Sequence, residues 1–184
     1  CGTLGAILGG IQYGGTGVYF ERTYDLIAMP HDALRIDLDF IALDTWDGET
    51  AQVLLDGAEV WAWSGRTSGG HNECGRGSPE LVQHMSEEID HTGHTAVLRV
   101  TTTLDQAAGD ESFAIDNVRV IPVQTSFSCS PNVLCQRGVF DNFEDGTDEW
   151  TSNVDPLSTT GCDAMTQVLG LSLIHISEPT RPNE

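Results

Sequence analysis

The chain has 184 residues, with 28 acidic and 8 basic side chains, and its formal net charge is −20. Nucleic acids and anionic membrane surfaces repel such a chain, so the charge argues against both as partners and favours solubility and cation binding. An apolar content of 39% is enough for a packed core, but no run of about 18 apolar residues occurs, which excludes a membrane-spanning helix in this sequence.

Alternation of apolar and polar residues predicts β-strands along the first two thirds of the chain. Leu34, Ile36, Leu38 and Phe40, for example, fall on one face of a strand, and the residues between them are charged. Residues 81–89 fit either a strand or a short helix. In chain order, strands are predicted over residues 4–8, 18–24, 33–40, 51–55, 60–63, 96–101 and 112–123.

Two local features refine this pattern. Asp56-Gly57 suits a type I′ hairpin turn, because glycine tolerates a positive φ. Within residues 112–123 the apolar phase changes between Ile115 and Val118, which predicts a β-bulge near Asp116-Asn117. Many short alternating strands separated by glycine-rich and polar turns indicate an all-β fold, an antiparallel β-sandwich of jelly-roll type.

Acidic residues gather in two clusters, LDTWDGE (43–49) and LDQAAGDES (104–112). If folding brings the clusters together, several carboxylates converge, and they repel one another unless a cation lies between them. Ca²⁺ is the natural cofactor, because it takes about six to eight hard oxygen ligands in flexible geometry. The predicted ligands are Asp44, Asp47, Glu49, Asp110 and Glu111, with Asp105 and Asp116 as outer candidates.

Two other interpretations of these acids remain open. They can be solvated turn residues, because aspartate is common in turns for backbone reasons. They can also form a catalytic pair for glycoside hydrolysis, with Asp47 or Glu49 opposite Asp110 or Glu111. The sequence has no GxSxG, P-loop, GxGxxG or HExxH motif, and the His91-x2-His94 spacing fits a solvated polar turn better than a metal site.

Tryptophans raise the possibility of glycan binding, because exposed aromatic faces stack on sugar rings. Trp61 and Trp63 share one strand face, and Trp46 lies inside the acidic turn, which makes it the best candidate for an exposed ring. We therefore name Trp46, Trp61 and Trp63 as candidate ligand-binding residues. The alternative for each of them is packing in the core.

The last third of the chain suggests a second module. Residues 1–123 are predicted to form one sandwich that lacks its opening strand, and 124–138 a linker with a small cysteine loop. Residues 1–9 and 162–170 share Cys, Leu and Gly at one offset, so 139–170 is predicted to begin another copy. We expect Phe140, Phe143 and Trp150 of that segment to pack on the edge left open in the first module.

The five cysteines are an odd number for a secreted protein. Cys129 and Cys135 can close the short loop, and Cys1 can pair with Cys74, which leaves Cys162 without its mate. Five reduced thiols are the alternative. Residues 171–181 resemble the in-frame translation of a sequencing-library adapter, so 171–184 are set aside as an artefactual tail.

The stretches LDFIALDTWDGETAQVLLDGAEVW (38–61) and LDQAAGDESFAIDNVRV (104–120) resemble tandem extracellular β-sandwich repeats in large surface proteins of ciliates and other protists. Cys-Gly at positions 1 and 74 also fits the repeat pattern. FAIDNVRV is similar to the closing strand of lectin-like and MAM-like jelly rolls, beside which an acidic loop often holds Ca²⁺. Thr45 stands where serine is usual, and Phe113-Ala114 where Trp-Gly is usual.

The resemblance implies an adhesion, matrix or glycan-binding role and no catalysed reaction. We expect an extracellular or cell-surface, Ca²⁺-stabilised, disulfide-bonded module. Its expected partners are a glycan or a surface or matrix protein, together with neighbouring copies of the same module. A glycoside-active enzyme and a purely structural spacer are the alternatives.

Overall fold

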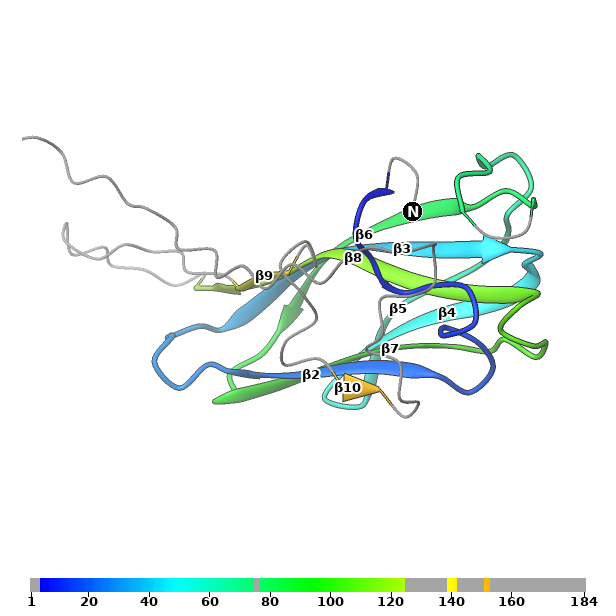
Figure 1. Cartoon of the computed structure of the whole chain (residues 1–184). Helices are drawn as coiled ribbons and strands as arrows, with labels where there is room; N and C mark the ends of the chain where they lie inside the picture. The colour runs from blue at the N-terminus through cyan, green and yellow to red at the C-terminus, as the bar shows by residue number, and fades with distance from the viewer. Residues whose placement is uncertain (1–3, 75–76, 125–138, 142–150, 153–184) are drawn as a thin grey trace, which may run out of the picture.

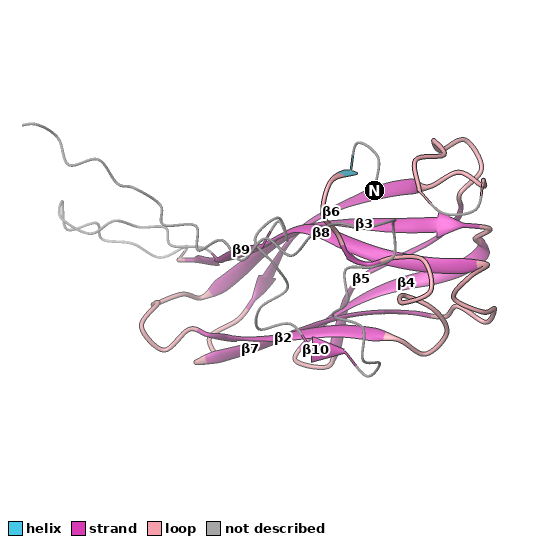
Figure 2. Ribbon diagram, in the orientation of Figure 1, coloured by secondary structure: helices cyan, strands magenta, loops and turns pink. Residues whose placement is uncertain are grey.

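The computed structural model describes residues 4–74, 77–124, 139–141 and 151–152. Strands and loops make up nearly all of this part of the chain, and the strands form two facing layers (Figure 1, Figure 2). The strands are β1 (Leu8–Gly9), β2 (Tyr19–Asp25), β3 (Ala33–Asp44), β4 (Asp47–Leu55), β5 (Ala58–Arg66), β6 (Leu81–Asp90), β7 (Thr95–Thr102), β8 (Glu111–Val123), β9 (Val139–Asp141) and β10 (Thr151–Ser152).

All the strand pairs are antiparallel. One sheet has the order β1-β8-β3-β6, with β9 also paired to β8, and the other has the order β10-β2-β7-β4-β5. The first eight strands have the orders 1-8-3-6 in one sheet and 2-7-4-5 in the other, which are the strand orders of a jelly roll. The predicted all-β fold, an antiparallel β-sandwich of jelly-roll type, is confirmed.

The core lies between the sheets and contains the alternating residues that the sequence pattern placed on one face. Leu34, Ile36, Leu38 and Phe40 of β3 are each 0% exposed. They pack against partners from the opposite sheet, such as Val53 and Leu98. A second, smaller cluster on the outer face of β3 and β8 contains Ile11, Ile41, Leu43, Cys74 and Ala114, and Leu4 and Ile7 pack against it.

The local predictions can be compared with the backbone. The register of β3 against β8 shifts between Asp37 and Asp39, opposite the 116–119 segment, and Asn117 has a φ of 52°. The predicted bulge is therefore present. Asp56 and Gly57 have φ values of 51° and 82°, as the predicted type I′ turn requires. Residues 81–90 form a strand, and the predicted strand at 4–8 is reduced to Leu8–Gly9.

Two short strands from beyond the linker pair with the sandwich. β9 pairs with Val118–Val120 of β8, on the edge where β1 pairs with Ala114 and Ile115. β10 pairs with Phe20 and Glu21 of β2, at an edge of the other sheet. The predictions for the side chains of Phe140, Phe143 and Trp150, for the loop of Cys129 and Cys135, and for residues 153–184 lie outside the described residues.

Candidate metal site

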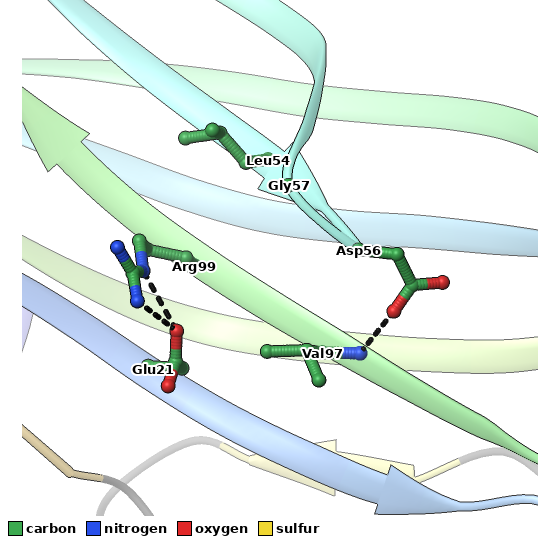
Figure 3. A pocket seen from close by; sticks show the side chains of 6 residues that line it. All are labelled: Glu21, Leu54, Asp56, Gly57, Val97 and Arg99. Carbon is green, nitrogen blue, oxygen red and sulfur yellow. Dashed lines mark hydrogen bonds and ion pairs between the residues drawn. The ribbon is translucent and has the colours of Figure 1, made fainter.

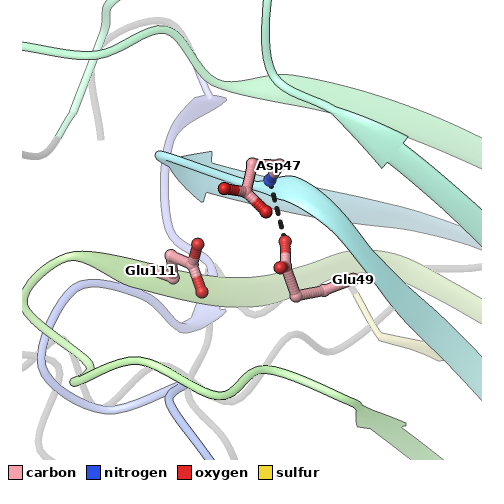
Figure 4. Close-up of side chains that lie close together, drawn as sticks. All are labelled: Asp47, Glu49 and Glu111. Atoms are coloured by element: carbon pink, nitrogen blue, oxygen red, sulfur yellow. Dashed lines mark hydrogen bonds between the residues drawn. The ribbon is translucent and has the colours of Figure 1, made fainter.

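Three carboxylates meet at one end of the sandwich. Asp47, Glu49 and Glu111 each offer an oxygen, and these oxygens lie within 4.8 Å of one another. Asp47 and Glu49 belong to the start of β4, and Glu111 is the first residue of β8. Figure 4 shows the three side chains pointing toward one another. We call this group the acidic corner.

Hydrogen bonds between the two acidic stretches hold the corner together. Asp44 at the end of β3 pairs with Glu111 at the start of β8. Both the backbone N–H and the hydroxyl of Thr45 donate to the carbonyl of Asp110, at 3.3 and 2.8 Å. The Thr45 hydroxyl therefore links the turn after β3 to the residue before β8. The LDTWDGE and DES segments therefore lie side by side, which is the condition on which the predicted cation site depends.

Glu49 is held as a carboxylate by its own turn. Its Oε2 accepts hydrogen bonds from the backbone N–H groups of Asp47 and Gly48, at 2.8 and 3.1 Å. Burial opposes ionisation of Glu49, but the backbone N–H groups of Asp47, Glu49 and Gly48 outweigh it, so the pKa of Glu49 is lowered from its usual value. Glu49 therefore carries a negative charge at neutral pH.

The surroundings of Glu111 favour its protonated form, in contrast to those of Glu49. It is 0% exposed, and its Oε1 accepts a hydrogen bond from the Gln106 side chain at 3.1 Å. Its Oε2 is buried and has no hydrogen-bond partner among the described residues. Burial, followed by the nearby charges of Glu49, Asp47 and Asp105, raises the pKa of Glu111 to about 7. A buried carboxylate facing two others requires either a proton or a cation.

The residues fit a hard divalent cation. The corner offers carboxylate oxygens and neither histidine nor cysteine, which favours Ca²⁺ or Mg²⁺ over zinc. Glu49 Oε2 and Glu111 Oε1 already accept hydrogen bonds, whereas Glu111 Oε2 accepts none from the part of the chain that the structure describes. Asp47 is exposed, so water can complete a shell of about six to eight oxygens around Ca²⁺.

The other predicted ligands do not join this group. Asp44 is 2% exposed, and its carbonyl accepts a hydrogen bond from the Thr67 hydroxyl. Asp110 contributes its backbone carbonyl to the Thr45 contacts. Asp105 acts on Glu111 through its charge, and Asp116 accepts a hydrogen bond from the backbone of Asn117 at the bulge.

The prediction that Trp46 is exposed is wrong. The indole is 2% exposed, and its Nε1 donates to the carbonyl of Ser112 at 2.7 Å. Its ring packs edge-on against Phe40, with centroids 5.6 Å apart. Burial removes the apolar ring from water while the indole N–H keeps a partner. Trp46 therefore holds the acidic corner against the core and is not available to stack on a sugar.

Trp61 and Trp63 share one strand face, as predicted, and that face points inward. Both are half-buried, and their ring centroids lie 6.2 and 6.5 Å from that of Phe40. The predicted role of these tryptophans as an exposed glycan platform is not supported by this packing. Cys74 is 7% exposed and packs in the cluster that Leu4 and Ile7 cover, while its predicted partner Cys1 lies outside the described residues.

The structure also contains a second group of titratable side chains, which no sequence pattern indicated. His31 Nε2 and His91 Nδ1 share a hydrogen bond at 2.9 Å, and His91 Nε2 lies 3.1 Å from Asp56 Oδ2. The carbonyl of Met29 accepts a hydrogen bond from His31 Nδ1 at 2.6 Å. We call these three side chains the histidine cluster. Sixty residues separate the histidines, so no local spacing indicates their contact.

Comparisons with known proteins add little beyond this geometry. No protein-family model matches the chain, and no curated protein matches it significantly. One solved structure, described as the crystal structure of dimeric latent PorU from Porphyromonas gingivalis, is similar over 70% of this chain and 15% of its own, at 9% identity and a TM-score of 0.42. The described residues contain no helix long and apolar enough to cross a membrane.

Proposed function

We propose that this chain is a non-catalytic extracellular module for binding or adhesion, stabilised by Ca²⁺ at the acidic corner and directed at a glycan or a surface or matrix protein. The observation that carries the cation site is the buried Oε2 of Glu111, which faces Asp47 and Glu49 and accepts no hydrogen bond from the described residues. A cation between these oxygens removes both the repulsion and the cost of a bare buried charge.

Such a cation links parts of the chain that are distant in sequence. Asp47 and Glu49 start β4, in the sheet β10-β2-β7-β4-β5, while Glu111 starts β8 in the other sheet. A bound ion therefore stabilises the sandwich by connecting its two layers at one end. This is a structural role for the metal, and it requires no reaction.

A glycoside-active site is the second candidate, because the pKa values of Glu49 and Glu111 move apart, as in an acid–base pair. Burial is the difficulty, since a general acid must reach the sugar oxygen and Glu111 is 0% exposed. Turnover on a polysaccharide panel that Glu49→Gln abolishes would establish the enzyme and overturn the binding-only proposal.

An extracellular location agrees with the proposed pairing of Cys1 with Cys74. Cys74 is buried beside Ile11 and Ile41, and the early residues Leu4 and Ile7 pack against the same cluster. A disulfide there contributes roughly 2–4 kcal/mol to the stability of the fold. Mass spectrometry of a non-reducing digest tests the pairing, and separate peptides for the two cysteines would contradict it.

Thermal unfolding tests the cation. At 100 times its dissociation constant, a bound ion adds about 2.7 kcal/mol to the free energy of unfolding, so the melting temperature in Ca²⁺ should exceed that in EDTA by about 10 °C. Glu111→Gln should abolish this difference. Glu80→Gln is the matched control, because Glu80 is also buried with one bare oxygen but lies outside the acidic corner. Equal melting temperatures in Ca²⁺ and EDTA would contradict the proposal.

A further inference from the structure

The outer face of the sheet that contains β2, β7 and β4 has a hollow of about 420 Å³. This volume is in the range of small-molecule sites, roughly 300–1,000 Å³. Figure 3 shows the side chains around it, which come from three neighbouring strands and from the turn after β4. The lining residues of this outer hollow are Glu21, Leu54, Asp56, Gly57, Val97 and Arg99.

Strand alternation explains why these side chains point outward. Phe20, Val53 and Leu98 are buried in the core, so the residue after Phe20 and Val53 and those flanking Leu98 face the other side of the sheet. Glu21, Leu54, Val97 and Arg99 are nevertheless only half-exposed. A face that served solubility alone would expose its charged side chains more fully.

The charged groups of the hollow are already ordered. Arg99 binds Glu21 through Nε and a terminal nitrogen, at 2.7 and 2.6 Å from Oε2. The guanidinium also lies over the ring of Tyr19, 4.2 Å from its centroid. One strand away, the Gln52 side chain donates to Glu59 at 2.7 Å. Fixed donors and acceptors reduce the entropy cost of binding a polar ligand.

The chemistry of the lining indicates the class of ligand. Leu54 and Val97 offer an apolar floor, and Glu21 and Arg99 offer acceptors and donors beside it. Glu21 and Asp56 outnumber the one arginine, and the whole chain carries a net charge of −20, so anionic ligands are repelled. A neutral sugar matches these features, because its ring has an apolar C–H face and a rim of hydroxyl groups.

We propose that the outer hollow binds neutral sugar residues of a glycan, with the ring on Leu54 and Val97 and the hydroxyls on Glu21 and Arg99. This inference rests on the glycan-binding part of the proposed function, and it relocates that activity from the tryptophans to β2, β4 and β7. It does not require the cation, since Asp47 and Asp56 lie at opposite ends of β4.

Affinity gel electrophoresis of the full chain tests the inference, with neutral glucans, mannans, galactans and xylans as probes and heparin as the anionic comparison. At least one neutral polysaccharide should retard the chain, and heparin should not. Arg99→Ala should weaken retardation about tenfold, since it removes charged hydrogen bonds. Arg35→Ala is the matched control, because Arg35 pairs with Asp37 on the opposite sheet, and it should bind like the parent.

Val97→Trp provides a second test that leaves the ion pair intact, because a large ring fills the hollow and should abolish retardation even if Arg99→Ala fails to fold. The inference is overturned if no neutral glycan is retained, or if Val97→Trp binds like the parent. Calcium binding is measured separately. If the chain binds Ca²⁺ but no neutral glycan, the inference about the hollow is wrong and the cation site stands. If it binds a neutral glycan but no Ca²⁺, the inference about the hollow stands and the cation site is wrong.

Discussion

The two ends of β4 carry two clusters of titratable side chains, which differ in how their charged and polar groups are paired. Asp47 is the first residue of the strand, and Asp56 follows its last. At the histidine cluster, Asp56 accepts from the backbone N–H of Val97 at 2.8 Å and lies beside His91, which in turn contacts His31. At the acidic corner, three carboxylates face one another.

The difference indicates where a group from outside the chain, such as a cation, is needed to balance charge. The histidine cluster places histidine ring nitrogens, which can donate, next to a carboxylate and a carbonyl, which accept, and its side chains come from three different loops. The acidic corner has a surplus of acceptors and one buried oxygen to which no described residue donates. We therefore expect perturbations at the histidine cluster to change stability without changing cation binding, and those at the acidic corner to change stability and cation binding together.

The largest effect should come from Trp46→Ala. Removing this buried ring costs about 3–5 kcal/mol of the free energy of unfolding, and it also loses the hydrogen bond to Ser112 that holds the corner. Chemical denaturation should show the lower stability, and calorimetry a weaker affinity for Ca²⁺. Unchanged Ca²⁺ affinity in a folded Trp46→Ala variant would contradict the link between the ring and the corner.

The next effect is a pH dependence that belongs to the acidic corner. Glu111 has a pKa of about 7 in the folded chain against an ordinary value of 4.5, so the folded state binds its proton more tightly. The resulting penalty is absent below pH 4.5, grows as the pH rises to about 7, and amounts to roughly 3 kcal/mol above that pH. In EDTA, melting temperatures of the parent should therefore fall relative to Glu111→Gln between pH 5 and 8.

Saturating Ca²⁺ should remove that fall, because the ion replaces the proton. Parallel melting curves for the parent and Glu111→Gln across this pH range in EDTA would show that the carboxyl is not perturbed. The proposed difference between the acidic corner and the histidine cluster would then have no physical basis.

A smaller loss is expected at the histidine cluster. His91→Ala removes the contacts with His31 and Asp56 and should lower the free energy of unfolding by about 1–2 kcal/mol. Calcium affinity should stay within about twofold of the parent, because the site lies at the other end of β4. A larger change in affinity would mean that the two ends are coupled through the sheet.

The smallest effect should come from Asp105→Asn, which removes a neighbouring charge and no ligand. Asp105 contributes to the raised pKa of Glu111 through its charge alone. Exposed charges of this kind are worth roughly 0.2–1 kcal/mol, so Ca²⁺ affinity should fall by about two- to fivefold. An effect as large as that of Glu111→Gln would instead identify Asp105 as a direct ligand.

Local patterns in the sequence predicted much of the fold. In a strand, successive side chains point to opposite faces of the sheet, so the alternation of apolar and polar residues shows which face each side chain occupies. The buried face of β3 and the bulge at Asn117 were predicted in this way, and the Asp56-Gly57 turn was predicted from its dipeptide. The approach of the two acidic stretches was a condition of the predicted cation site and was not itself predicted. Its physical basis is the pairing of the end of β3 with the start of β8.

Features that depend on contacts between distant residues could not be predicted. A tryptophan in a turn can face water or the core, and Trp46 is buried because the Ser112 carbonyl, 66 residues away, accepts its N–H. The choice among the acids likewise depends on backbone direction: Asp44 has a φ of 65° and is buried, outside the group of Asp47, Glu49 and Glu111.

Isothermal titration calorimetry of the full chain with Ca²⁺ at pH 7.5 tests the acidic corner most directly. We predict one binding event per chain for the parent and no measurable heat for Glu111→Gln, while Glu80→Gln titrates like the parent. An absence of heat with the parent, or unchanged binding by Glu111→Gln, would contradict the assignment of Asp47, Glu49 and Glu111 as a cation site.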